Sequence, residues 1–339
     1  KDYVQFDPGV FNEDDGKVYL YTGMDPKSPN IFTRFKPVNA NGAMGVELED
    51  DMLTIKEETF SHIGKSQQSS KGTGYEGHEF FEASSMRKFN GKYYFIYSSV
   101  NGHELCYGVS DSPLGEFEYG GTLVSIGDVG LAEKPNNYLG NTHGSVEFIN
   151  GKYYVFYHRQ TNRHCHSRQA CAEEIELLPG GKFKQAETTS CGLNGNALMG
   201  KGYYEARIAC NLWSKNGVKF YTAKTPAGVH PYFTQSGKDR ENNPDQYIAN
   251  FCDGATAGFK YFQFEGNNSE ISVTVRGNGG GKIAVTDKIG GNPLAEINIL
   301  KGRGERTYKA PMSALNGKKA LYFTYYGEGK VDFIGFTLI

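Results

Sequence analysis

Four polar residues lie on or beside predicted strands, where their side chains could take part in chemistry: Asp7, Glu82, His143 and Arg168. Two of them are carboxyl groups, the side chains that act as general acid or base in many hydrolases. Pro8 has no backbone N–H and biases Asp7 away from helical geometry, so we expect Asp7 at the start of a strand. An Asx-type turn at Asp7 is the structural alternative.

Glu82 interrupts an otherwise apolar segment between Phe81 and Ala83. Burying an unpaired carboxylate costs several kcal/mol, so Glu82 should have either a partner or a chemical role. Glu76 and Glu79 compete for the role of an acid. Strand alternation places Glu79 and Glu82 on opposite faces, and the aromatic and small neighbours of Glu82 make it the better candidate for a raised pKa.

His143 lies between a polar turn and Gly144, just before a predicted strand, and Arg168 lies on the next strand region. A single histidine is more often a satisfied structural residue than a ligand. The small neighbour Gly144, however, leaves the ring of His143 room to face a central cavity.

A sequence motif that occurs three times, called the repeated phrase below, indicates which elements position these residues. The copies are DDGKVYLYTG, NGKYYFIYSS and NGKYYVFYHR, with Gly16, Gly91 and Gly151 at their turns. A glycine turn followed by an alternating aromatic run is typical of one edge of a β-hairpin. Because the copies start roughly 60 to 75 residues apart, they predict radially repeated four-stranded sheets, as in a β-propeller.

The overall composition excludes several classes of protein. The 339 residues carry a formal net charge of −2 with scattered Lys and Arg, which argues against a nucleic-acid or anionic-membrane partner. No apolar run approaches the length of a membrane span. The chain is long enough for two domains, and 14% aromatic residues with 44 glycines fit short strands joined by tight turns.

The six cysteines form no CxxC pair. Cys165 and Cys171 flank a histidine-rich stretch that could suggest structural zinc. Side chains alternate between faces on a strand and no second ligand pair follows, so free buried thiols are favoured over zinc.

A change of amino-acid composition divides the chain. Residues 191–202 are small and glycine-rich, which is typical of a linker, whereas residues 1–190 carry the three repeats. Residues 203–339 contain a second series of alternating segments and end on a strand, the pattern of an antiparallel β-sandwich. The sequence therefore predicts an all-β chain, with propeller sheets followed by a sandwich.

Four motifs, in order, resemble glycoside hydrolase family 43: DPGVFNEDDGKVYLYTG, FFEASSMRKFNGKYYFIYS, NTHGSVEFINGKYYVFYHR and SRQACAEEIE. This resemblance covers residues 1 to about 190 and implies a five-bladed β-propeller. It also implies that Glu82 is the general acid and that Asp7 orients this acid and adjusts its pKa. Arg168, His143 and Phe81 would contact the substrate, and His143 would approach a central calcium ion.

The resemblance implies an inverting α-L-arabinofuranosidase or β-xylosidase acting on plant arabinoxylan, arabinan or xylan. Inverting enzymes hold acid and base about 6.5–9.5 Å apart, which leaves room for a water molecule. An ionised Asp7 and an apolar wall at Phe81 would both raise the pKa of Glu82. A non-catalytic carbohydrate-binding protein and a purely structural propeller are the alternatives. A secreted or periplasmic, bacterial-type protein is expected.

Three repeats predict three blades, whereas the family has five. We therefore expect the chain to be the C-terminal portion of the catalytic domain, with the N-terminal propeller portion of the same protein as its partner. The general base is then expected upstream of residue 1; a reduced fold with Asp7 as the base is the less favoured interpretation.

The C-terminal part resembles a family 6 carbohydrate-binding module, a β-jelly-roll. Tyr247, Phe259 and Tyr261 could form a sugar-stacking platform or could equally be sandwich core. By the same resemblance, Glu205 and Asp332 would supply ligands to a structural calcium ion.

Overall fold

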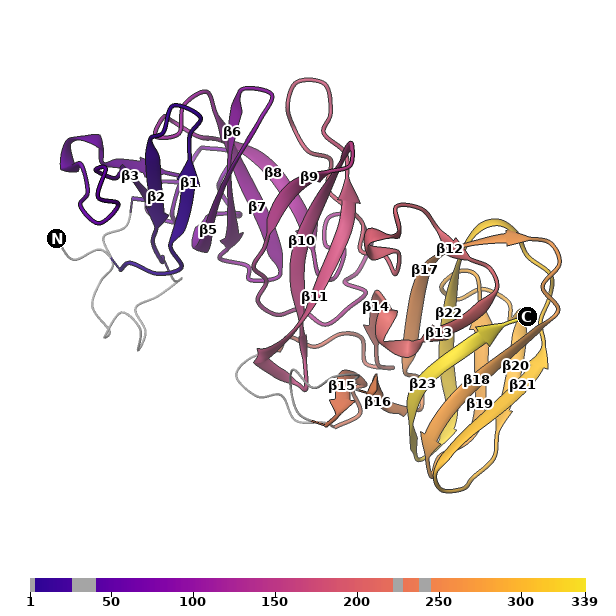
Figure 1. Ribbon diagram of the computed structural model, residues 1–339. Helices are drawn as coiled ribbons and strands as arrows, with labels where there is room; N and C mark the ends of the chain where they lie inside the picture. Colours follow the sequence, from indigo (N-terminus) through magenta and orange to yellow (C-terminus); the bar gives the residue numbers. More distant parts are fainter. Residues whose placement is uncertain (1–3, 26–40, 222–227, 238–244) are drawn as a thin grey trace. The chain divides into compact units, whose positions relative to one another are not determined.

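The computed structural model describes residues 4–25, 41–221, 228–237 and 245–339 (Figure 1). Apart from three short 3-10 helices, the regular elements of these residues are β-strands, so the all-β prediction is confirmed. The helices are η1 (Glu57–Thr59), η2 (Gly192–Asn194) and η3 (Ala206–Ile208). No helix in the described ranges has the length and apolar character needed to cross a bilayer.

The chain forms two compact units, and each unit is assembled from separate stretches of the sequence. The first unit comprises residues 1–125, 141–158 and 170–186, and the second comprises residues 126–140, 159–169 and 187–339. Two short segments from the region of the repeats therefore pack with the second unit. The predicted boundary at residues 191–202 stays a prediction, and this stretch contributes η2 and strand β12.

The first unit holds two small antiparallel sheets and the larger part of a third, in all of which consecutive strands are neighbours. Such meanders have the build of propeller blades. The sheets are β1 (Gly9–Asn12), β2 (Val18–Thr22), β3 (Ala43–Glu47) and β4 (Ser61–Ile63); β5 (Phe80–Phe89), β6 (Lys92–Ser99), β7 (Glu104–Ser110) and β8 (Glu118–Ser125); and β9 (Ser145–Ile149), β10 (Lys152–Thr161) and β11 (His164–Ile175).

Each copy of the repeated phrase forms the predicted hairpin turn and the strand that follows it. Gly16, Gly91 and Gly151 all have positive φ, at 90°, 78° and 83°. Only glycine adopts this region without a steric cost, which explains its recurrence at the turn.

The aromatic run of β6 packs on both sides because strand side chains alternate between faces. Tyr93, Phe95 and Tyr97 join a core with the first sheet. Tyr94 and Ile96 join a different core with the third sheet. The phrase thus supplies the apolar layers on both faces of the second blade.

The second unit contains a β-sandwich of two six-stranded sheets, as predicted for the C-terminal part. The sheets are β12 (Leu198–Met199), β14 (Asn211–Trp213), β17 (Thr256–Glu265), β19 (Gly280–Thr286), β20 (Ala295–Ile299) and β22 (Asn316–Glu328); and β13 (Gly202–Glu205), β15 (Tyr232–Ser236), β16 (Asp245–Cys252), β18 (Glu270–Gly277), β21 (Glu305–Pro311) and β23 (Lys330–Leu338). Phe259 on β17 is fully buried and its ring lies 4.8 Å from that of Phe336 on β23. Phe259 is therefore sandwich core and not a sugar platform.

Candidate active site

The first strands of the three sheets, β1, β5 and β9, carry Phe81 and Glu82 or directly follow Asp7 and His143, whereas Arg168 lies on β11. These strands are neighbours inside the first unit, since β5 lies against both β1 and β9. The relative register of the three strands decides which side chains meet.

Two contacts fix the register of β1 against β5. Gly9 approaches Ser84 so closely that a Cβ atom on Gly9 would lie 2.4 Å from the Ser84 carbonyl oxygen. Farther along, Lys88 Nζ lies 2.5 Å from Glu13 Oε1, again a pair of residues 75 positions apart. Equal spacing at both points means that the two strands run in the same direction.

Two polar contacts fix the register of β5 against β9 in the same way. The hydroxyl groups of Ser85 and Ser145 lie 2.9 Å apart, and Arg87 Nε donates to Glu147 Oε1 at 2.6 Å. Both pairs are 60 residues apart, so β5 and β9 also run in the same direction. The spacings of 75 and 60 match those between the glycines of the repeated phrase.

This register brings Asp7 and Glu82 to the same end of neighbouring strands, because each lies two residues upstream of the contact between Gly9 and Ser84. His143 lies near the same end. Glu82 is the cross-strand partner of Ser98, and the Ser98 hydroxyl donates a hydrogen bond to the Thr142 carbonyl oxygen.

The backbone is irregular at both carboxylates. Asp7 has φ 45°, and Ala83, next to Glu82, has φ 69°. The pairing of β5 with β6 shifts register on either side of Glu82, as at a β-bulge. Left-handed non-glycine residues cluster at functional sites, where the surrounding structure holds a strained conformation. Asp7 precedes β1 as predicted, but with a left-handed φ and not the extended one favoured before proline.

The end of β2 and the residues just after it hydrogen-bond to both segments that carry the candidate carboxylates. Thr22 Oγ1 accepts a hydrogen bond from the Phe6 N–H and donates one to the Phe6 carbonyl oxygen, both at 3.0 Å. The Asp25 N–H donates to the Phe81 carbonyl oxygen at 2.8 Å. Phe6 precedes Asp7 and Phe81 precedes Glu82, so this segment holds the backbone beside each candidate residue.

Asp25 itself is a buried carboxyl group that the sequence did not reveal. Burial raises its pKa to about 6, against the opposing effect of hydrogen bonds from the Gln67 N–H and the Ser66 side chain. Its side chain therefore retains a proton to higher pH than an exposed aspartate does.

The competitors of Glu82 are engaged elsewhere. Glu79 Oε1 accepts hydrogen bonds from the Ser70 hydroxyl at 3.1 Å and the Gly77 N–H at 3.0 Å. Glu76 accepts one from the Gly72 N–H at 3.0 Å. These bonds favour turn-stabilising roles for both residues.

The remaining predicted residues differ in exposure. Phe81 and Glu82 are half-buried, whereas His143 is exposed. Arg168 is also exposed and belongs to the second unit, where its Nε donates to the Cys165 carbonyl oxygen at 3.3 Å. The roles assigned to these residues stay predictions.

Comparison with known proteins identifies the family. The model of the glycosyl hydrolases family 43 matches residues 1–183. A xylosidase/arabinosidase of Thermoclostridium stercorarium is 44% identical over 99% of this chain and 70% of its own length. This chain belongs to glycosyl hydrolase family 43.

Two solved family 43 structures are also similar. An arabinoxylan arabinofuranohydrolase from Bacillus subtilis, in complex with cellotetraose, is 22% identical, with a TM-score of 0.49 over 99% of this chain and 67% of that one. A β-xylosidase/α-arabinofuranosidase from a compost metagenome, in complex with xylotriose and in a calcium-free form, is 27% identical, with a TM-score of 0.42 over 55% of this chain and 59% of that one. The chain spans about half the length of several further curated relatives.

The calcium ligands named from the sequence stay a prediction. Calcium takes six to eight oxygen ligands. The Glu205 carboxylate is paired with Arg207, and Asp332 Oδ2 lies 3.3 Å from Arg276 Nε, so each of these carboxylates already has a cationic partner. His143 offers nitrogen donors only.

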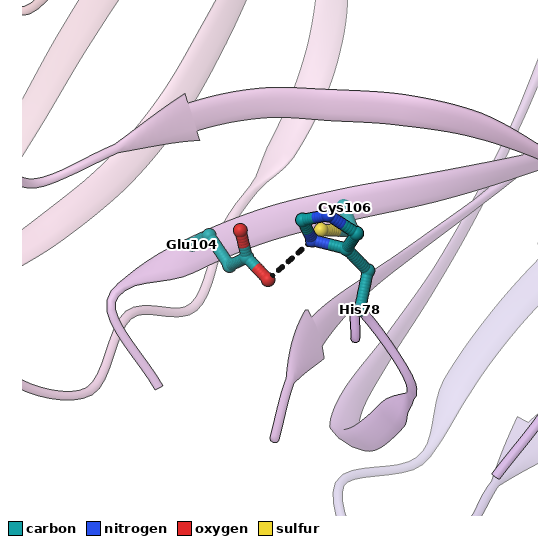
Figure 2. Close-up of side chains that lie close together, drawn as sticks. All are labelled: His78, Glu104 and Cys106. Carbon is teal, nitrogen blue, oxygen red and sulfur yellow. Dashed lines mark hydrogen bonds and ion pairs between the residues drawn. The ribbon is translucent and has the colours of Figure 1, made fainter. Parts of the chain in front are cut away.

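Sequence reasoning missed a polar cluster in the second sheet, formed by His78, Glu104 and Cys106 (Figure 2). Burial alone would raise the pKa of Glu104, but hydrogen bonds from His78, Ser99 and Asn101 outweigh it and lower this pKa to about 2. Glu104 and Cys106 are two positions apart on β7 and so share a face, a signal that the sequence does contain.

None of the six cysteines forms a disulfide, but only Cys106 and Cys210 are buried; Cys165 and Cys171 are half-buried, not buried as predicted. The histidine-rich stretch around Cys165 belongs to no metal-ligand cluster in the described part of the chain, whereas Cys106 does.

Proposed function

We propose that the protein containing this chain is an inverting glycoside hydrolase that removes arabinofuranosyl or xylosyl residues from arabinoxylan, arabinan or xylan, or from their oligosaccharides. One observation carries this proposal: the codirectional strands β1 and β5 bring Asp7 and Glu82 to the same end, beside two left-handed backbone positions. Glycoside hydrolysis needs a carboxylic acid that protonates the leaving group, besides a carboxylate base or nucleophile; Glu82, with Asp7 at the same strand end, is proposed for the first role.

In this proposal Glu82 protonates the leaving-group oxygen, and Asp7 orients Glu82 and adjusts its acidity. Arg168, His143 and Phe81 contact the sugar. No residue of this chain is assigned as the general base, which activates water on the opposite face of the sugar ring.

The substrate class follows from the relatives. The 44% identical relative is named for both xylosidase and arabinosidase activity, so both sugars are kept as candidates. The sandwich is proposed as a carbohydrate-binding module, and Tyr247 and Tyr261 remain its candidate platform residues because both are half-buried. A secreted or periplasmic location fits a polysaccharide substrate.

The test is hydrolysis of arabinoxylan-derived oligosaccharides by the full-length protein, followed by proton NMR during the first turnovers. The expected product is free arabinose or xylose with the anomeric configuration opposite to that of the cleaved bond. Oligosaccharide binding without any released sugar would contradict the proposal and favour a non-catalytic binding protein. A retained configuration would contradict the inverting mechanism.

A further inference from the structure

His78, Glu104 and Cys106 bring three kinds of metal-binding atom to one point in the second sheet (Figure 2). His78 precedes β5, and the other two residues lie on β7. One imidazole nitrogen, one carboxylate oxygen and one sulfur all lie within 4.8 Å of one another. None of the three residues has a role in the proposed reaction.

The hydrogen bonds of this cluster are unevenly shared between the two oxygens of Glu104. Oε1 receives His78 Nδ1 at 2.8 Å, the Ser99 hydroxyl at 2.6 Å and the Asn101 amide at 2.9 Å. Oε2 accepts a long hydrogen bond from the Thr122 hydroxyl at 3.5 Å, and the Cys106 thiol also hydrogen-bonds to this carboxylate. Glu104 is only 3% exposed, so these side chains, and not solvent, hold its carboxylate.

The sulfur of Cys106 is also held by polar side chains. It lies 3.6 Å from the Thr122 hydroxyl and 3.8 Å from the Tyr119 hydroxyl, it hydrogen-bonds to Glu104, and the residue is fully buried. The thiol and the carboxylate therefore face each other directly, in a place where a metal ion could take the position of the thiol proton.

We propose that His78, Glu104 and Cys106 form a site for a zinc-class divalent transition metal. Nitrogen, oxygen and sulfur donors together suit Zn²⁺ or Co²⁺, whereas Ca²⁺ and Mg²⁺ prefer oxygen alone. Bonds of about 2.0–2.3 Å to a shared ion need ligand atoms about 3–4 Å apart, which requires only a small contraction of this cluster.

The fourth position of the metal is a water molecule. The His78 side chain is 39% exposed, so the site opens to solvent on that side and a metal ion can enter there. On binding, Cys106 loses its thiol proton to solvent, and His78 binds through Nδ1 with its proton on Nε2. Ser99 and Asn101 then keep Glu104 oriented, as outer hydrogen-bond donors do around metal ligands.

The metal would fasten the segment that leads into β5. The Tyr97 hydroxyl donates to the His78 carbonyl oxygen at 2.7 Å, and Phe80, the first residue of β5, lies two positions beyond His78. Because the site stabilises this segment without contacting substrate, metal binding should raise thermal stability more than it changes turnover.

Titration of the metal-free protein with Co²⁺ tests the proposal, since a thiolate bound to Co²⁺ gives a near-ultraviolet charge-transfer band. The expected result is a band that saturates at one Co²⁺ per chain and disappears when Zn²⁺ is added. Sites made by surface histidines alone, such as His164 and His166, give no such band.

Variants identify the ligands. Cys106→Ser should abolish the band, and His78→Gln, at a partly exposed position, should weaken Co²⁺ binding about 10- to 100-fold or more. Cys210→Ser, which changes the other buried cysteine, is the matched control and should keep the band. Absence of a saturable band in the parent protein, or its persistence in Cys106→Ser, would overturn the proposal.

Discussion

Glu82 and Glu104 are two acidic residues of the same sheet, yet their surroundings differ sharply. Glu104 begins β7, is almost fully buried and accepts hydrogen bonds from three side chains through one oxygen. Glu82 is half-buried and lies where the pairing of β5 shifts register, next to left-handed Ala83. One carboxylate is thus enclosed by hydrogen-bond donors, and the other, which is predicted to act, is half-buried beside a left-handed residue.

This contrast separates two uses of a carboxylate within one blade. A group that is enclosed by donors contributes to stability through those bonds. A carboxylate at a bulge, at the same strand end as a second carboxylate, is positioned by the backbone and can reach a ligand. Loss of Glu104 should therefore affect folding, and loss of Glu82 should affect chemistry.

The largest stability effect is expected for Glu104→Ala. Removing this carboxylate leaves His78, Ser99 and Asn101 without their acceptor in a buried site, which should lower the free energy of unfolding by about 3 kcal/mol. Urea denaturation in the presence of a chelator measures this change. Glu82→Gln should lower it by about 1 kcal/mol or less; equal losses in the two variants would remove the contrast.

A smaller effect is expected for Thr22→Val, which keeps the shape of the side chain but removes both bonds to Phe6. The unpaired backbone groups should cost about 2 kcal/mol of stability. Displacement of Asp7 should also lower kcat about tenfold, with little change in KM.

Thr22→Ser is the control for this variant because it retains the hydroxyl group. It should restore most of the lost kcat. An unchanged kcat in Thr22→Val would show that the hydrogen bonds between Thr22 and Phe6 do not position Asp7.

The smallest effect concerns Glu13, whose contact with Lys88 sets the register of β1 and β5. Burial would raise the pKa of Glu13, but hydrogen bonds from Lys88, Tyr93 and the Asp14 N–H lower it to about 2. A lowered carboxyl pKa stabilises the fold above the unfolded value of 4.5, and this contribution is lost as pH falls through about 2.

Glu13→Gln should accordingly cost about 1 kcal/mol at pH 7, and the difference from the parent protein should vanish near pH 2. Denaturation midpoints across this pH range measure it, with the exposed Glu118→Gln as control. A pH-independent difference would show that the contact acts through packing and not through charge.

The sequence predicted the blades well because the repeated phrase is local. A glycine turn and an alternating strand are short-range features, and both recur with the spacings that set the register of Gly9 with Ser84 and of Ser85 with Ser145. Aligning the three copies is thus sufficient to place Asp7 and Glu82 at the same end of β1 and β5.

Contacts between distant segments could not be predicted in this way. His78 and Glu104 are 26 residues apart, and nothing in either motif indicates that they meet. The two hydrogen bonds between Thr22 and Phe6 depend on a backbone shape that the sequence does not specify. In the sandwich, a phenylalanine such as Phe259 suits either the core or a sugar-binding platform, and only the packing shows that it is core.

The most direct test of the central claim is the dependence of Glu82→Gln on the leaving group, measured in the full-length protein with Glu118→Gln as control. If Glu82 is the general acid, kcat on xylo- or arabino-oligosaccharides should fall about 10²- to 10⁴-fold, and kcat on nitrophenyl glycosides, which need little protonation, should fall far less. Equal losses on both substrates, or near-normal kcat on oligosaccharides, would contradict the assignment of Glu82.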